Sequence, residues 1–234
     1  MQRTAAATAP EAYATRGLQQ NEARVRDLTD LAGTQGARDF AAANRDATAG
    51  QLYKQAYDVG VDLTKMTPAR KGEITKLLSR PAVQDALAQA RTLAANEGVN
   101  LKNPAGSVKG LDYLKRAMDD QIGGAQGNEQ RVLVALKNRL LTTIDELSPE
   151  YASARKVFAD MSKPINQMDI AQAVADKSIN KLNDTLKPQS FANALTDDTA
   201  AAATGFKKAT LESTLEPAQL ARLNAIKEDL ARSV

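Results

Sequence analysis

The spacing of large apolar residues over 129–147 is the feature that most constrains the fold of this chain. Apolar side chains recur there at alternating steps of three and four residues, at Leu133, Leu136, Leu140, Ile144 and Leu147. This period places them on one face of an α-helix. No stretch of strand length shows β-branched or aromatic residues alternating with polar ones. Most prolines and glycines fall where helices would start or stop. The sequence therefore predicts an all-α, elongated multi-helix protein.

Two further helices are expected beside this one. The segment 107–124 carries apolar residues at i, i+3, i+7 and i+11, namely Leu111, Leu114, Met118 and Ile122. After 129–147, Ser148 can cap a new helix with Pro149 at its first position, and Pro164 is expected to mark its end. Its expected inner face comprises Tyr151, Ala154, Phe158 and Met161. Short connections between these helices predict an antiparallel three-helix unit around 107–163.

The flanking segments have weaker patterns. Long alanine-rich helices are expected over 10–32 and 37–59, with narrow apolar stripes. The stripes comprise Leu18, Val25, Leu28 and Ala32 in the first helix, and Phe40, Ala43, Ala47 and Tyr57 in the second. Helices capped by Thr67 and started by Pro81 should follow, the latter stopping at Gly98.

Shorter helices are expected beyond residue 164, the last of them starting near Pro217. The low-complexity segment 195–205 is expected to be loose, and 123–128 to form a flexible turn. These patterns predict an N-terminal arm (1–66), a helical module (67–163) and a region of short C-terminal helices (164–234).

The apolar composition favours assembly over a single thick core. Hydrophobic residues make up 43% of the chain but aromatics only 4%, so few large side chains can anchor a core. Narrow stripes then predict that helix faces are buried against other chains, in a homo-oligomer. The N-terminal "MQRTAAATAPEAYATRG" has no apolar run typical of a signal peptide, and no window has the ~20 apolar residues of a transmembrane helix.

Candidate catalytic and metal-binding patterns are weak. The chain has no histidine and no cysteine, which removes the commonest general base and the commonest metal ligands. The acidic pairs Asp119–Asp120 and Asp197–Asp198 are sequence neighbours that would diverge by about 100° on a helix. "DLTDLAGTQGARD" lacks the spacing of a calcium loop, and "GGAQGNEQR" lacks the lysine and Ser/Thr of a phosphate loop. We therefore predict no catalytic residues, no cofactor and no metal site.

Basic residues leave a second possibility open. The chain carries 31 Lys and Arg against 28 Asp and Glu. The basic residues considered for nonspecific DNA contact are Arg16, Arg24, Arg26, Arg38, Arg45, Lys177, Lys181 and Lys187. Acidic residues lie among them and no aromatic stacking pattern accompanies them.

Tyr151 and Phe158 are interpreted as core anchors, with a binding spot as the alternative. The apolar stripes over 129–147 and 217–233 are interpreted as helix-packing faces, so membrane contact would require a rearrangement.

Three consecutive stretches carry a family resemblance. "RPAVQDALAQARTLAANEG", "GLDYLKRAMDDQIGG" and "LVALKNRLLTTIDELSPEYASARKVFADMSKP" follow one another over about 80–164. This succession resembles a helical module in large virion proteins of tailed bacteriophages and prophages, of the internal virion or DNA-ejection type. The resemblance implies no catalytic residue. It implies a non-enzymatic structural or ejection protein of the virion, with partners along the portal–tail axis or in an internal core.

Two alternatives stay open beside that reading. One is a genome-associated protein that contacts DNA without sequence specificity. The other is a cell-wall-degrading enzyme, which the absence of a catalytic pattern disfavours.

Overall fold

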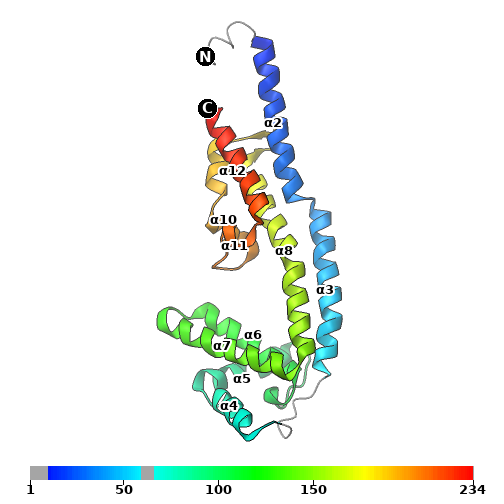
Figure 1. Ribbon diagram of the computed structural model, residues 1–234, viewed down its shortest axis with the longest axis vertical. Coiled ribbons are helices and arrows are strands. Elements are labelled where there is room, and N and C mark those ends of the chain that lie inside the picture. The colour runs from blue at the N-terminus through cyan, green and yellow to red at the C-terminus, as the bar shows by residue number, and fades with distance from the viewer. Residues whose placement is uncertain (1–9, 59–65, 234) are drawn as a thin grey trace. The chain divides into compact units, whose positions relative to one another are not determined.

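The computed structural model describes residues 10–58 and 66–233 and confirms the all-α prediction (Figure 1). Residues 1–9 and the expected end of the second helix at residue 59 lie outside the described residues. The contacts divide the chain into two compact units: unit 1 joins Met1–Asn44 to Asp160–Val234, and unit 2 is Arg45–Ala159. This division differs from the three consecutive segments expected, because each unit is built from residues distant in sequence.

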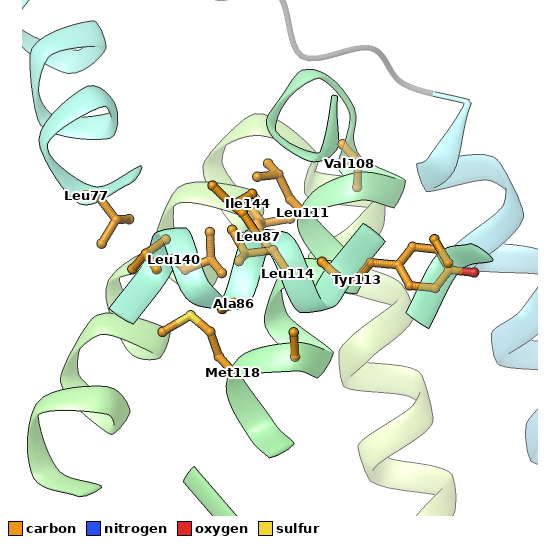
Figure 2. Packing of buried hydrophobic residues seen from close by; sticks show 14 of the residues in the cluster. Leu77, Ala86, Leu87, Val108, Leu111, Tyr113, Leu114, Met118, Leu140 and Ile144 are labelled. Atoms are coloured by element: carbon orange, nitrogen blue, oxygen red, sulfur yellow. The ribbon is translucent and has the colours of Figure 1, made fainter. Parts of the chain in front are cut away.

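Unit 2 is a helical bundle. It holds the end of α3 (Gln35–Tyr57), the start of α8 (Pro149–Ser178) and the elements between them. These are α4 (Pro68–Leu78), α5 (Pro81–Asn96), the 3₁₀ turn η2 (Pro104–Gly106), α6 (Val108–Gly124) and α7 (Gly127–Leu147). The α5 and α6 helices pack along each other, and α6 also packs on α7 (Figure 2). Their shared core contains Val83, Leu87, Leu111, Leu114, Met118, Leu140 and Ile144.

Local chemistry sets the helix limits of unit 2 as the sequence predicts. The Thr67 hydroxyl accepts a hydrogen bond from the Arg70 amide, and Pro68 opens α4. Gly98 takes a φ of 73° just after α5, which favours glycine. The Ser148 hydroxyl accepts the Tyr151 amide at 3.1 Å at the start of α8.

The predicted three-helix unit needs correction. The main helical partner of α6 is α5, and among the described residues of α8 only Tyr151 belongs to this core. The helix also does not end at Pro164, which lies inside α8. A proline removes one backbone hydrogen bond but keeps a helical φ. Buried residues beyond it, including Ile165 and Ile170, give the continuing helix a packed face.

Unit 1 contains a second core. Its elements are α2 (Pro10–Ala32), the start of α3, the rest of α8, β1 (Ile179–Asn180), β2 (Thr185–Leu186), α9 (Pro188–Ala194), α10 (Asp197–Thr204), α11 (Leu211–Thr214) and α12 (Pro217–Arg232). The core residues include Leu28, Ile170, Val174, Phe191, Leu223, Ile226 and Leu230. Packing of α12 on α9 and α2 places helices that are far apart in the sequence in one core.

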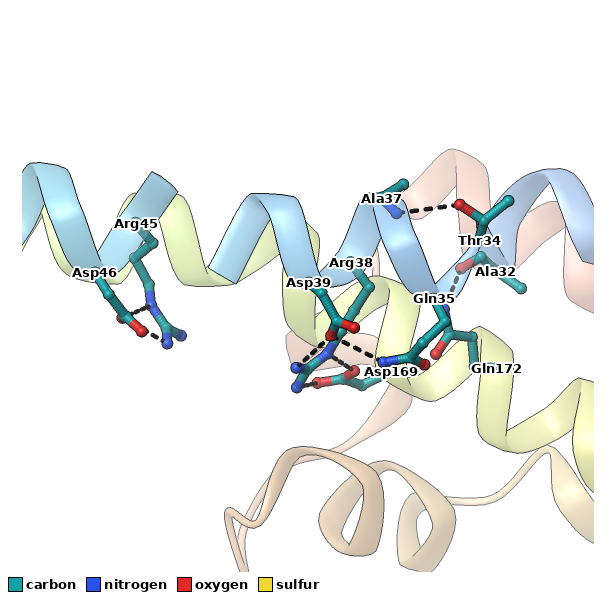
Figure 3. Close-up of polar contacts among 10 residues, drawn as sticks. All are labelled: Ala32, Thr34, Gln35, Ala37, Arg38, Asp39, Arg45, Asp46, Asp169 and Gln172. Carbon is teal, nitrogen blue, oxygen red and sulfur yellow. Dashed lines mark hydrogen bonds and ion pairs between the residues drawn. The ribbon is translucent and has the colours of Figure 1, made fainter. Parts of the chain in front are cut away.

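Polar contacts join α2 and α3 to α8 within unit 1 (Figure 3). Gly33 separates the two helices with a φ of 62°, and Thr34 caps α3 by accepting the Ala37 amide. The side-chain amide of Gln172 donates to the Ala32 carbonyl at 3.0 Å, which satisfies a carbonyl at the end of α2. Arg38 binds both carboxylate oxygens of Asp169, at 2.8 and 3.2 Å.

The segment 195–205, expected to be loose, contains the capped helix α10 (Asp197–Thr204). Thr196 accepts the Thr199 amide, Ala200 is fully buried, and Gly205 ends the helix with a φ of 73°. The alanine repeat that suggested disorder is a strong helix former, and its small side chains fit a close contact. The turn expected over 123–128 is also shorter, since only Ala125 and Gln126 separate α6 from α7.

A short hairpin was not expected from the sequence. β1 and β2 pair antiparallel, with Ile179 opposite Leu186. The side-chain amide of Asn21 in α2 donates to the Asp184 carbonyl at 2.9 Å and accepts from the Leu186 backbone amide at 3.0 Å. Two-residue strands are too short for the alternation of apolar and polar residues that predicts a strand. The hydrogen bonds of the Asn21 side chain connect this hairpin to α2.

Candidate interaction surfaces

A tyrosine cluster around Asp112 forms a partly buried polar arrangement in unit 2. The hydroxyl groups of Tyr57 and Tyr151 each donate to one carboxylate oxygen of Asp112. Tyr53 stacks on Tyr57 with ring centroids 5.8 Å apart and meets Tyr151 edge-on at 5.6 Å. Tyr151 is fully buried. Three helices, α3, α6 and α8, are thus joined by one carboxylate.

The cluster is suited to structural support rather than to proton transfer. Burial raises the pKa of Tyr53 to about 12. Burial, then the charge of Asp112 and the hydrogen bond to it, raises the pKa of both Tyr57 and Tyr151 further above the ordinary value. All three phenols therefore stay protonated near neutral pH, and two of them act as fixed donors.

These shifts predict a loss of stability in alkali. Tyrosine in an unfolded chain ionises near about pH 10, whereas the buried phenols keep their protons to higher pH. Above about pH 10 the folded state therefore binds more protons than the unfolded state. The contribution of these tyrosines to the free energy of unfolding is then complete below about pH 10 and falls as the pH rises further. Denaturant midpoints measured across this range should fall with pH, and the variant Tyr57→Phe/Tyr151→Phe should fall less steeply. Phenolate absorbance that rises for all tyrosines near pH 10 with the helical signal intact would contradict the burial.

Phe158, expected to be a core anchor, lies at the surface. Its side chain is 38% exposed, and the Arg45 guanidinium lies 4.5 Å from its ring centroid. Tyr151, seven residues earlier, takes the buried position. A cation over an exposed ring is a favourable contact. Phe158 therefore pairs with Arg45 at the surface and does not extend the buried face that begins at Tyr151.

Most of the basic residues considered for DNA contact bind partners in their own unit. The pairs are Arg24 with Asp229, Arg38 with Asp169, Arg45 with Asp46, Lys177 with Thr199, and Lys181 with Asp176. Arg16, Arg26 and Lys187 are exposed. Much of the N-terminal arginine charge is therefore compensated by local carboxylates (Figure 3).

A basic groove lies instead between α4 and α7 in unit 2. It encloses about 440 Å³ and is lined by Arg70, Glu73, Lys76, Leu77, Arg80, Leu136, Arg139, Thr142 and Thr143. Arg70 is held by Glu73 at 2.8 Å and by Glu146. Within the described part of the chain, Lys76, Arg80 and Arg139 have no carboxylate partner. The sequence does not predict this site because α5, η2 and α6 separate α4 from α7 in the chain.

Three of the four aspartates in the acidic pairs, Asp119, Asp120 and Asp197, make contacts within their own unit. Asp119 binds Lys137 at 2.7 Å and Lys115 at 3.0 Å, while Asp120 accepts a hydrogen bond from Gln89. Asp197 accepts the Leu211 amide and so links α10 to α11. Each of these carboxylates therefore serves a local contact.

Among residues 10–58 and 66–233, no group of three or more acidic residues could hold a metal ion. Over the same residues, no helix is both long and apolar enough to cross a membrane. Comparison with protein-family models, with curated proteins and with solved structures gives no match to this chain.

Proposed function

We propose that this chain is a non-enzymatic structural or ejection component of a tailed-bacteriophage virion, acting through helix-mediated assembly. Its support is of two kinds. The succession of stretches over 80–164 resembles a helical module of such virion proteins. The second support is physical: part of the helical surface lacks the packing that normally stabilises a helix.

The first turns of α2 carry the proposal. Every side chain described between Glu11 and Gln20 is exposed, so this stretch of helix has no core of its own. An isolated helix of fewer than about 12–15 residues is marginal in water, and Gly17 weakens it further. Contact with a second copy of the chain would supply the missing packing.

Two large apolar side chains mark where that contact would form. Leu18 of α2 is 62% exposed and Phe40 of α3 is 74% exposed. The sequence pattern predicts both in the apolar stripes of their helices, and within their own unit neither is buried. Burying a leucine or phenylalanine side chain contributes about 1.5–3 kcal/mol, which is enough to hold a weak helix contact together.

Sedimentation of the whole chain tests the assembly. We expect a concentration-dependent mass above the 25.0 kDa of one chain. The variant Leu18→Gln/Phe40→Gln should weaken association by about tenfold or more, since each tenfold step corresponds to about 1.4 kcal/mol. Glutamine matches leucine in helix propensity, so Leu18→Gln tests the contact and not the helix.

Leu182→Gln is the matched control. Leu182 is 95% exposed at the β1–β2 turn, and its replacement should leave the mass unchanged. A chain that stays monomeric at every concentration, or a control as disruptive as the double variant, would overturn assembly through α2 and α3. The virion role is tested separately by mass spectrometry of purified particles from the phage that encodes the chain. Several copies per particle are expected, and absence from the particles would refute that role.

A further inference from the structure

We infer that the basic groove between α4 and α7 is a phosphate-binding site. The observation that carries this inference is a concave surface where three cationic side chains, Lys76, Arg80 and Arg139, converge without an acidic partner in the described residues. Among the lining residues, four are cationic and one, Glu73, is acidic. This excess of positive charge is confined to one hollow, whereas the arginines of the N-terminal segment are largely paired.

The helices fix the groove from both sides. Arg70, Glu73 and Leu77 lie on one face of α4, and Leu136, Arg139 and Thr143 lie on one face of α7. Leu77 and Thr143 are buried beneath the groove. The bond from Arg70 of α4 to Glu146 of α7 joins the two walls. The helices that carry the cationic side chains are thus held together by buried residues and by an ion pair.

The groove chemistry favours phosphate over an organic ring. None of the described residues that line it is aromatic, so a base would find no stacking partner among them. Arginine and lysine are the usual partners of phosphate oxygens, and Arg80 and Arg139 can each offer two parallel donors. Both threonine hydroxyls already donate to backbone carbonyls of α7, at 2.9 and 3.1 Å. The donors left for a ligand are therefore cationic.

Phosphate could come from a nucleic-acid backbone or from a free nucleotide, and two probes separate these sources. Fluorescence anisotropy of the whole chain is measured with labelled duplex DNA and with a labelled nucleoside triphosphate at about 50 mM salt. DNA binding alone would identify the backbone as the source, and triphosphate binding alone a free nucleotide.

The variant Lys76→Ala/Arg80→Ala/Arg139→Ala tests the groove itself. We expect it to weaken binding of the active probe by about tenfold or more. For DNA, the plot of log affinity against log salt should also become shallower by about 3, one for each lost cation. Because these side chains have no carboxylate partner among the described residues, thermal unfolding should change little.

The control variant removes the same charge from other surfaces. Arg26→Ala/Arg91→Ala/Lys187→Ala also removes two arginines and one lysine, all of them exposed. It should keep the groove-dependent binding. The inference is overturned if the wild-type chain binds neither probe, or if the two triple variants bind equally well.

Discussion

Replacing Gly110 with alanine is expected to destabilise unit 2 by about 3 kcal/mol, the upper end of the usual range for overpacking. Gly110 is buried in the first turn of α6, where its amide donates to the Ser107 hydroxyl at 3.1 Å. A Cβ at this position would lie 2.1 Å from the Pro104 carbonyl oxygen and 2.7 Å from the Pro104 Cα. Because these atoms belong to the backbone, no rotamer change relieves the clash, and η2 and α6 must separate. Denaturant unfolding followed by circular dichroism measures the loss.

Gly50→Ala is the matched control in the same unit. Gly50 lies in α3, is exposed, and has nothing within 4 Å of an added Cβ. Alanine loses less backbone entropy there, so this variant should gain about 0.5–1 kcal/mol. The same chemical change is thus expected to have opposite signs at two helical glycines. A Gly110→Ala variant as stable as the wild type would show that η2 does not contact α6 as described.

The sequence predicted features that depend on neighbouring residues. Thr67 with Pro68, Gly98, and Ser148 with Pro149 set helix limits through hydrogen bonds and dihedral preferences that act over a few residues. Pro164 was misread because a local rule stops a helix at proline, while packing beyond it keeps α8 going.

Features that depend on distant residues were not predictable in this way. A periodic pattern shows that Tyr151 and Phe158 share a helix face, but the surrounding helices decide that only Tyr151 is buried. The groove needs α4 beside α7, and the Asp112 cluster needs α3, α6 and α8 together. None of these pairings leaves a repeat or a motif in one chain, so periodicity could not predict either site.

Replacing Asp112 with alanine is expected to cost about 3 kcal/mol of stability. The change removes the acceptor of both the Tyr57 and the Tyr151 hydroxyl groups. A buried donor left without a partner costs about 1–3 kcal/mol, more than the hydrogen bond itself contributes. Asp120→Ala, on the same helix, is the control, since Asp120 is exposed and accepts only a 3.4 Å bond from Gln89. It should change stability by less than about 0.5 kcal/mol.

A double-mutant cycle separates the buried hydroxyls from other effects of Asp112. In the background Tyr57→Phe/Tyr151→Phe no hydroxyl is left to satisfy, so the added cost of Asp112→Ala should shrink to about 1 kcal/mol or less. An equal cost in both backgrounds would mean that Asp112 acts through something other than the two hydroxyl groups. The predicted difference follows from the burial of Tyr151: removing the carboxylate of Asp112 leaves a hydroxyl donor in the protein interior without an acceptor.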